Sequence, residues 1–581
     1  MTWMSRASTL LLAFASFVLF TTPQCRWSEE VAVQGDSSNT GTPVAGGSLR
    51  VGIRSDPQTW NRLLATDTVS GVITDQIHAP LLRVNRKTQE VEPALAESWS
   101  FSDDGRELVL NLRAGVRFSD GTPLTAADVA FTFQALHDPE VASPLVETAT
   151  IDGEPLVPEI VDPLTLRFRL PRRTAVVERI FDSIPVLPRH RLQASLEDGS
   201  FASEYGIGAP EERIVGLGPF TLARYVPGQR VVLHRNPHYW KLGPEGEQLP
   251  YLEGIIFEIL SDANALMLRF RAGELDLLSP VSPEDFLSLR KGDRPNLRLI
   301  DLGADVAPER IWFNLNPESP VPAEKRAWFS DRRFRQAISL AIDRRSIAKA
   351  VYAGLASPAA GPISPANRKW WNETIEPPPF DPELARGLLL EAGFRPSSSG
   401  GGLALLGPEG QPARFTLITN ADNPYRVKMA ALIQEDLVRI GVEMNLLPLD
   451  FSSLIGRITR SSDYEACLLN LRFTDPDPSA ALPLWLSRSP HHIWHPSQPA
   501  PATAWEARID ALMNEQMLAV DQGLRKRLYD EVQALAVEHL PLIDVVVPHA
   551  LVGATARLGN LAPTPHWHPT LWNSDELYLT R

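Results

Sequence analysis

Residues 93–136 read PALAESWSFSDDGRELVLNLRAGVRFSDGTPLTAADVAFTFQAL, and this stretch indicates its local structure more clearly than the rest of the chain. Its beginning predicts a helical turn. Asp103-Asp104-Gly105 predicts a tight turn, because glycine accepts a positive φ without the clash of a Cβ atom. Polar and apolar residues alternate from 107 to 112, as they do in a half-buried strand. This part therefore predicts two short strands joined by a turn.

A capped helix is predicted for the second half of the stretch. Thr125 stands three residues before Asp128, which is the spacing of a capping box, in which each side chain accepts a hydrogen bond from a backbone N–H of the first turn. Val129, Phe133 and Leu136 recur at the spacing of one helical face. Such motifs occur in most globular proteins, so by themselves they predict a hairpin and an amphipathic helix without indicating a function.

Length and composition limit the classes of protein that are possible. A chain of 581 residues is too long for one ordinary core, so we expect two to four domains. Hydrophobic residues make up 44% and charged residues 22%, which is typical of a globular protein. The formal net charge of −14 argues against nucleic acid or an anionic membrane as the main partner. We therefore expect no nucleic-acid partner.

The N-terminal residues predict export from the cytoplasm. Residues 1–25 have the pattern of an export signal, in which Arg6 supplies the positive charge ahead of an apolar run over residues 7–20. This run is shorter than the ~20 residues that a comfortable membrane span needs. Residues 26–47 contain a polar, Gly- and Ser-rich stretch and are predicted to be a flexible linker. The expected location is the periplasm or cell envelope.

Cys25 leaves two possibilities open for the mature N-terminus. A cysteine between an apolar segment and a flexible tether resembles the lipid-anchor site of a bacterial lipoprotein. However, Thr22-Pro23-Gln24 precedes it, and the usual motif has a small residue directly before the cysteine. The alternatives are a lipid anchor on Cys25 and a plain cleaved signal.

Strand-like and helix-like segments alternate along the remaining chain, which predicts a mixed α/β class. The predicted strands are 47–54, 230–234, 255–260, 415–419, 443–449 and 542–547. The predicted helices are 264–272, 334–342, 345–352, 382–392, 425–440 and most of 506–538. The strand–helix–strand order from 415 to 449 suggests a parallel crossover.

Several blocks resemble, in the same order, those of the extracellular solute-binding proteins of family 5, which serve peptide and nickel ABC importers. The blocks are Pro93–Leu136, Gly216–Phe220, Arg235–Trp240, Arg271–Asp276, Asp331–Ile338 and Asp475–Pro478. In the second block Leu217 replaces the usual threonine. The resemblance extends from about Gly47 to the C-terminus, so it covers most of the chain after the export signal.

The resemblance implies a periplasmic-binding-protein-like α/β fold of class II, with three domains in two lobes that close about a hinge. Domain I would combine residues 48–85, 214–308 and 548–581, domain II would be 86–213, and domain III would be 309–547. The implied hinge residues, in the segments that cross between the lobes, are Phe313, Asn314, Val547 and Pro548. A ligand would lie between the lobes, and its contacts with both lobes would stabilise the closed form.

The resemblance also implies where a ligand would be held. In peptide-binding members, a carboxylate just before the Asp-Pro segment pairs with the α-amino group of the peptide. By spacing back from Asp477-Pro478, this position falls on Thr474, and Asp475 serves only with a shift of one residue. This departure argues against recognition of a free amino terminus. Arg472 is the nearest cation and can pair with a ligand carboxylate. Alternatively, Arg472 and Asp475 form a local surface pair, and Asp475 and Asp477 are turn residues.

Histidines offer a second type of site. Imidazoles suit nickel, copper or zinc, and the family includes nickel binders. Five histidines stand in two short stretches, at His491, His492, His495, His566 and His568. No cysteine or acidic cluster completes a ligand set, so we predict no metal and no cofactor. The known hydrolase, zinc-protease and phosphate-loop motifs are absent from the sequence, so we do not expect an enzyme.

Taken together, the resemblance implies the extracytoplasmic substrate-binding component of an ABC importer. Its expected partners are a peptide or similar small solute and the permease subunits in the membrane, and we expect a monomer. The alternatives are binding of a non-peptide ligand or a nickel-type metal on the same fold, or a role as a sensing receptor.

Overall fold

The predicted hairpin is present in the computed structural model, which describes residues 43–292, 294–397, 403–473, 475–567 and 569–580. It consists of β4 (Ala96–Phe101) and β5 (Glu107–Leu112), joined by a turn in which Gly105 has a φ of +68°. Every second residue of β5 is buried, as predicted. The predicted helical turn is wrong, because Ala96 already pairs with Leu112 and the sheet holds this segment extended.

The predicted capped helix is α2 (Ala126–His137). The Asp128 carboxylate accepts hydrogen bonds of 2.9 Å from both the backbone N–H and the hydroxyl of Thr125. Val129, Phe133 and Leu136 are all buried, as predicted. They face a four-stranded antiparallel sheet of β4, β5, β9 (Thr165–Arg169) and β8 (Pro158–Asp162). The ring of Phe133 on the helix packs against that of Phe168 in β9, with 5.2 Å between the ring centroids.

The large sheet follows the order β10-β11-β12-β1-β13-β22-β15-β21-β19-β20. In that order its strands are Phe220–Val226, Arg230–Arg235, Gly254–Ile259, Ser48–Ile53, Leu277–Leu278, Ile543–Thr555, Glu309–Phe313, Ala466–Asn470, Arg414–Asn420 and Glu443–Leu449. β19 and β20 are parallel and are connected through α12 (Pro424–Arg439). The predicted crossover is therefore confirmed.

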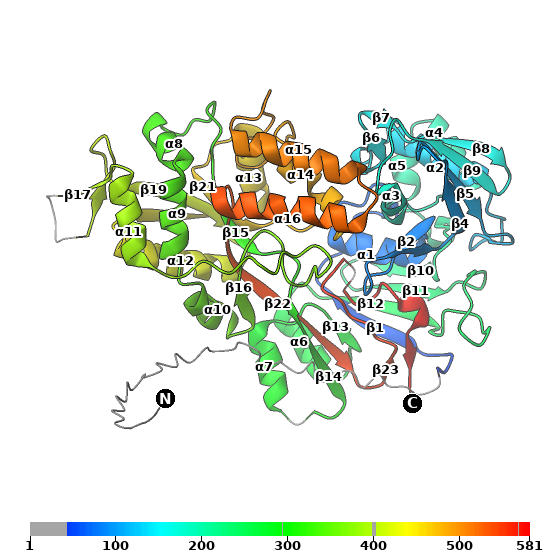
Figure 1. The fold of residues 1–581 in the computed structure, drawn as a ribbon. Helices are drawn as coiled ribbons and strands as arrows, with labels where there is room; N and C mark the ends of the chain where they lie inside the picture. The colour runs from blue at the N-terminus through cyan, green and yellow to red at the C-terminus, as the bar shows by residue number, and fades with distance from the viewer. Residues whose placement is uncertain (1–42, 293, 398–402, 474, 568, 581) are drawn as a thin grey trace, which may run out of the picture. The chain divides into compact units, whose positions relative to one another are not determined.

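The 13-residue strand β22 belongs to two parts of the sheet at once (Figure 1). Its first residues pair with β15, and residues 546–548 pair with β16 (Ala356–Pro358). Its last residues pair with β14 (Leu297–Ala304) and β13. The sequence pattern predicted only 542–547, because the mostly apolar run, which only Asp544 interrupts, is followed by Pro548 and His549.

The three largest hydrophobic cores divide the described chain into two sets of residues, and a smaller core joins Leu355 to Leu266 and Leu551 across this division. The largest core joins residues such as Leu49 and Leu110 to Val552 and Leu577. Two other cores contain only residues between Ile311 and Val546. We call residues 43–308 and 548–580 lobe 1, and residues 309–547 lobe 2. The finer division into domains I, II and III stays a prediction.

Helices cover both lobes, and α15 and α16 lie side by side on lobe 2 (Figure 1). The helices of lobe 1, besides α2, are α1 (Thr68–Ile77), α3 (Val177–Ser183), α4 (Arg189–Glu197), α5 (Phe201–Glu204), α6 (Ala263–Arg271) and α7 (Pro283–Lys291). Those of lobe 2, besides α12, are α8 (Ala323–Ser330), α9 (Arg332–Ala341), α10 (Arg344–Tyr352), α11 (Pro382–Glu391), α13 (Phe451–Gly456), α14 (Leu482–Trp485), α15 (Ala504–Leu518) and α16 (Gln522–His539).

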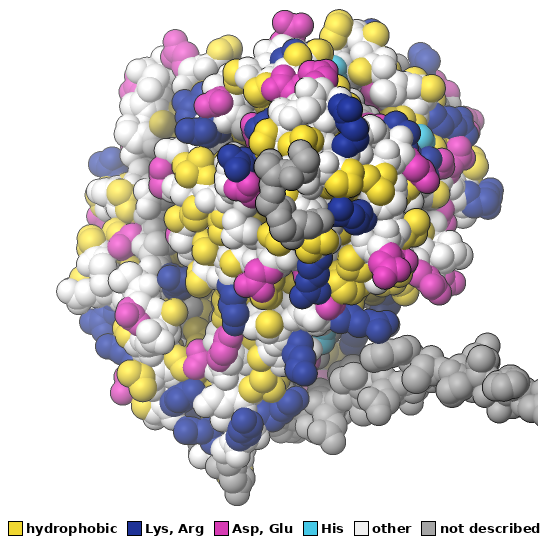
Figure 2. Space-filling model, turned by 90° about the vertical axis from the view of Figure 1, so that its left-hand side faces the viewer, with side chains coloured by type: hydrophobic (Ala, Val, Ile, Leu, Met, Phe, Trp, Pro, Cys, Tyr) yellow, Lys and Arg dark blue, Asp and Glu magenta, His cyan; other side chains and the backbone are white. Residues whose placement is uncertain are grey.

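Short strand pairs complete the fold. They are β2 (Leu82–Val84) with β3 (Val91–Pro93), β6 (Thr150–Ile151) with β7 (Glu154–Pro155), β17 (Arg395–Pro396) with β18 (Leu405–Leu406), and β23 (Leu558–Gly559) with β24 (Tyr578–Leu579). On the face that Figure 2 shows, side chains of both charges are interspersed with small hydrophobic groups. Over the residues that can be described, no helix combines the length and apolar character that crossing a membrane requires.

Candidate ligand-binding site

The two lobes meet along a line of polar contacts that we call the inter-lobe seam. It comprises Gln89, Glu90, Arg179, Asp305 and His566 from lobe 1, and Lys369, Arg472 and Asp475 from lobe 2. Lys369 Nζ lies 2.8 Å from a Glu90 carboxylate oxygen across the seam. A backbone hydrogen bond also crosses between the lobes, in which the N–H of Ala175 donates to the carbonyl of Met517 at 2.9 Å.

An ion pair between Arg179 and Asp475 joins the lobes at the centre of the seam. Arg179 Nε donates to both oxygens of Asp475, at 2.9 and 3.1 Å, and Arg179 Nη1 donates to the Gln89 carbonyl at 2.9 Å. The two side chains are only 11% and 17% exposed. Burial raises the pKa of Asp475, and the Arg179 charge opposes this shift. A partly buried pair of this geometry is stronger than a surface ion pair.

Arg472 makes a second ionic contact across the seam. Its guanidinium contacts the Asp305 carboxylate and donates to the Pro565 carbonyl at 3.3 Å, both in lobe 1. The alternative in which Arg472 and Asp475 pair with each other is therefore wrong, because both side chains have partners in the opposite lobe. Thr474, which stands between them, lies outside the described residues.

Asp477 is held inside lobe 2 and does not reach the seam. It is 4% exposed and receives two hydrogen bonds, of 2.9 and 2.8 Å, from the Arg525 guanidinium. Arg525 also stacks over the ring of Trp370, 4.9 Å from its centroid. Burial alone would raise the pKa of Asp477, but its hydrogen bonds with Arg525 lower it. The structure therefore gives Asp477 a role in holding the 475–478 turn in place.

His566 and Gln89 form a buried polar contact in lobe 1 at the seam. Their side-chain nitrogens are 2.7 Å apart, and each residue is only 6% exposed. Burial and the charges of Arg86, Arg472 and Arg179 lower the pKa of His566 to about 4, so the imidazole is neutral at neutral pH. Gln89 has a φ of +63°, which is unfavourable for a residue other than glycine and often marks a functional position.

The other predicted histidine stretch lies away from the seam. His492 is buried in lobe 2, where its ring nitrogens lie 2.9 Å from the Leu484 carbonyl and 3.3 Å from Glu506. His568 lies outside the described residues. Within the ranges that the structure covers, no three His, Cys, Asp or Glu side chains come close enough together to hold a metal ion.

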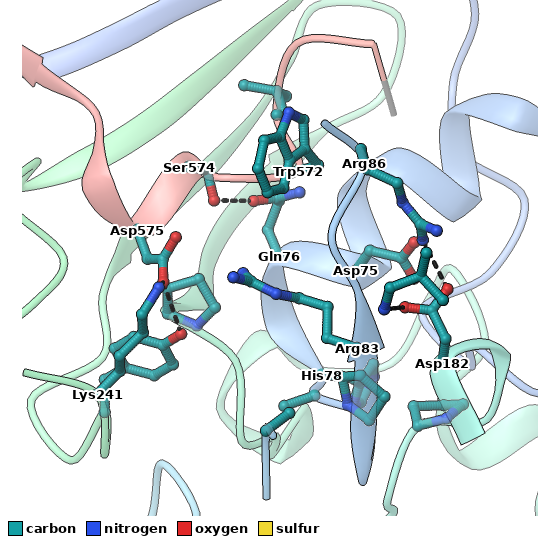
Figure 3. Close-up of a pocket in the computed structure, with 18 of the residues that line it drawn as sticks. Asp75, Gln76, His78, Arg83, Arg86, Asp182, Lys241, Trp572, Ser574 and Asp575 are labelled. Atoms are coloured by element: carbon teal, nitrogen blue, oxygen red, sulfur yellow. Dashed lines mark hydrogen bonds and ion pairs between the residues drawn. The ribbon is translucent and has the colours of Figure 1, made fainter. Parts of the chain in front are cut away.

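A cavity of about 130 Å³ lies in lobe 1 beside the seam (Figure 3). Two ion pairs line it, Arg86 with Asp182 at 2.7 Å and Lys241 with Asp575 at 2.8 Å. The guanidinium of Arg83 lies between them in Figure 3. Arg86 lines this cavity, and Gln89 of the seam stands three residues after it in the chain.

The predicted hinge residues occupy two different environments. Val547 and Pro548 lie in β22 where its pairing passes from the strands of lobe 2 to those of lobe 1. Phe313 and Asn314 lie further into lobe 2, where Phe313 is part of the core and Asn314 Nδ2 donates to the Ser462 and Tyr464 carbonyls. The hinge role of all four stays a prediction.

Sequence patterns could not reveal Arg179 and Gln89. Arg179 is separated from Asp475 by 296 positions, and no local motif connects them. His566 was noticed only as part of a possible metal site. The left-handed backbone at Gln89 has no sequence signal either, because glycine or asparagine is the usual residue there.

Comparisons with known proteins agree with this arrangement. The family model of the bacterial extracellular solute-binding proteins, family 5, matches residues 90–491. Di/tripeptide-binding protein 4 of Pseudomonas aeruginosa is 30% identical over 495 residues, which cover 81% of this chain and 83% of that protein. Oligopeptide-binding protein AppA of Bacillus subtilis is 27% identical over 557 residues, 94% of this chain and 93% of AppA.

The solved structures include AppA of Bacillus subtilis in complex with a nonapeptide. That structure is similar with a TM-score of 0.73 at 25% sequence identity, and the match covers 93% of this chain and 100% of AppA. The similarity therefore includes both lobes and the strands that connect them. The family model matches more than half of this chain, and the chain therefore belongs to the bacterial extracellular solute-binding proteins of family 5.

Proposed function

We propose that this protein is the extracytoplasmic substrate-binding component of an ABC importer, and that it captures a peptide or similar small solute between its lobes. The observation that carries this proposal is the seam itself, where charged side chains of both lobes, Arg179 with Asp475 and Arg472 with Asp305, meet face to face. Its relatives include proteins named for oligopeptide and di/tripeptide binding.

Ligand binding and lobe closure are coupled in this proposal. Opening of the lobes separates Arg179 from Asp475 and Arg472 from Asp305. A solute that contacts both lobes stabilises the closed form by its differential affinity for that form. We place the bend at Val547 and Pro548 and in the segment 305–309, because these residues connect the two sets of strands. The closed protein then delivers the solute to the permease.

The cellular setting is also part of the proposal. We propose that residues 1–25 direct export to the cell envelope and that the protein acts as a monomer. Cys25 lies outside the described residues, and a lipid anchor there would keep the protein at the membrane. Replacement of Cys25 by serine should then release the protein from membranes in a fractionation experiment. Equal retention of both forms would argue against the anchor.

The direct test of the function is to identify the solute. The protein is purified under native conditions, denatured, and the released small molecules are identified by mass spectrometry. Peptides are expected, and synthetic copies should raise the melting temperature. At 100 times its dissociation constant a ligand stabilises the folded state by about 2.7 kcal/mol. Stabilisation by nickel and by no peptide would contradict the proposal.

A further inference from the structure

Three acids near the centre of the seam are paired with cations of the protein. Asp475 is held by Arg179, Asp305 by Arg472, and Asp182 by Arg86. The acids that line the cavity are held in the same way, since Asp575 is paired with Lys241 and Asp75 with Arg62. A ligand ammonium would have to displace one of these cations, and an unpaired charge in a closed site costs several kcal/mol.

The surroundings of His566 favour the opposite charge. Three guanidinium groups, from Arg86, Arg179 and Arg472, act on this buried ring, and their combined charge disfavours a proton on it. Each arginine also has an acidic partner, and the net effect of these charges lowers the pKa of His566. A negative group beside this ring would lie in a favourable potential.

Two polar atoms near His566 lack a partner. Nη1 of Arg86 is buried without a hydrogen-bond acceptor, and Oε1 of Gln89 is buried without a hydrogen-bond donor. The two side chains are 9% and 6% exposed. Buried polar atoms are almost always satisfied, so these two unsatisfied atoms of lobe 1 indicate a place for a hydrogen-bonding ligand group. Since the nitrogen and oxygen of an amide can exchange places by rotation, Gln89 can present either a donor or an acceptor.

The space beside Arg86 suits a small group. The cavity volume of about 130 Å³ is more than the roughly 10–15 Å³ that one water molecule needs. A carboxylate group fits this volume. The cavity can therefore receive the end of a solute whose remainder lies along the seam.

We infer that lobe 1 carries a subsite for an anionic end group, a carboxylate, at Arg86, Gln89 and His566, and that the seam excludes a free ammonium there. This inference rests on the proposed capture of a peptide-like solute. It makes Arg86 and Gln89 specificity-determining residues of lobe 1, which no sequence motif singles out.

The test uses a synthetic pool of peptides of three to nine residues without charged side chains, prepared in four forms. The two ends are either free or blocked, by acetylation at the amino end and amidation at the carboxyl end. The full-length protein is mixed with all four forms, and mass spectrometry measures the fraction of each that is retained. Amidation removes a hydrogen-bonded charge and should therefore weaken retention by about 10-fold or more. Acetylation should weaken retention by less than about 3-fold.

Three variants locate the effect. Arg86→Gln and Gln89→Asn should reduce the penalty of amidation to less than about 3-fold. Asparagine tolerates the left-handed backbone at position 89, so the second variant is expected to fold even if loss of Arg86 perturbs lobe 1. Lys87→Gln removes an exposed charge from the same turn and should keep the full penalty.

Each outcome has a definite meaning. Strong loss of binding on acetylation, with little effect of amidation, would overturn the subsite and leave the proposed function intact. So would an amidation penalty that Arg86→Gln and Gln89→Asn leave unchanged. Failure to retain any of the four forms would overturn the peptide proposal, and the subsite with it.

Discussion

His566 is one side chain through which acidity should act on the seam. Its pKa of about 4 in the folded protein is below the ordinary 6.5, because burial and the facing Arg86, Arg472 and Arg179 disfavour the proton. The unfolded chain therefore binds the proton first as the pH falls. Stability is full above pH 6.5 and is lost progressively down to about pH 4, by about 3 kcal/mol.

Replacement of His566 by glutamine should flatten this part of the pH profile. Urea unfolding of the wild type and His566→Gln at pH 7, 5.5 and 4 measures the difference. The free energy of unfolding of the wild type should fall more between pH 7 and 4 than that of the variant. His78 also has a lowered pKa of about 4 and is unchanged in both proteins, so it cancels in the comparison. Parallel profiles would show that His566 does not titrate in this way.

Arg525 illustrates how one residue can fix a turn. Removing it by Arg525→Ala leaves the buried Asp477 carboxylate unpaired and removes the stacking on Trp370. Breaking a buried pair by loss of one partner typically costs about 3–5 kcal/mol. Arg527→Ala, on the exposed face of the same helix, is the matched control and should change the unfolding free energy by less than about 0.5 kcal/mol. Similar urea midpoints for the two variants would contradict this role.

Among the elements, the segment Gly216–Phe220 shows why two glycines are needed at fixed positions. A Cβ atom on Gly216 would lie 2.1 Å from the carbonyl oxygen of Ile77, at the end of α1. The backbone N–H of Gly218 donates to the same oxygen at 2.8 Å. The segment and the end of α1 are thus in contact along their backbones, which cannot yield as a flexible side chain can.

Substitution of Gly216 should therefore destabilise lobe 1. Gly216→Ala is expected to lower the free energy of unfolding by at least about 2 kcal/mol, within the range for overpacked sites. Gly208→Ala is the control, because nothing lies within 4 Å of a Cβ at that position. Thermal or urea unfolding measures both. Equal stability of the two variants would show that α1 can move aside.

Local patterns predicted the elements well where the signal is local. The alternation in β5, the apolar face of α2 and the β19–α12–β20 crossover are all confirmed. The early helical turn was wrong because pairing of Ala96 with Leu112 decides the backbone there. The length of β22 was missed for the same reason, since its second half is set by partners on β13 and β14 and not by its own apolar pattern.

On the scale of the whole molecule, the Arg179–Asp475 pair should influence how often the lobes are closed. Arg179→Gln removes charge-assisted hydrogen bonds that are typically worth about 1.5–3 kcal/mol each. Without ligand, the variant should have a larger radius of gyration than the wild type in small-angle X-ray scattering. Arg169→Gln, a change at a 71% exposed side chain of lobe 1, is the control. Identical scattering of all three proteins would contradict a closing role for the pair.

The seam itself could be predicted only in part. The resemblance indicated the segment that contains Arg472 and Asp475, and both residues lie at the seam. It could not give their partners, because Arg179 and Asp305 are distant in sequence and ordinary in their local context. Recognition between lobes depends on pairs that folding brings together, and neither periodicity nor capping carries information on them.

The shared strand β22 also affects the order in which the protein can fold during its synthesis. Lobe 2 is continuous from residue 309 to 547, so all of its core residues are made in one run. The main core of lobe 1 includes Leu49 near its beginning but also Val552, Leu558 and Leu577. The lobe that is started first therefore finishes last, and its early strands must wait for several hundred residues of translation before their final neighbours emerge from the ribosome.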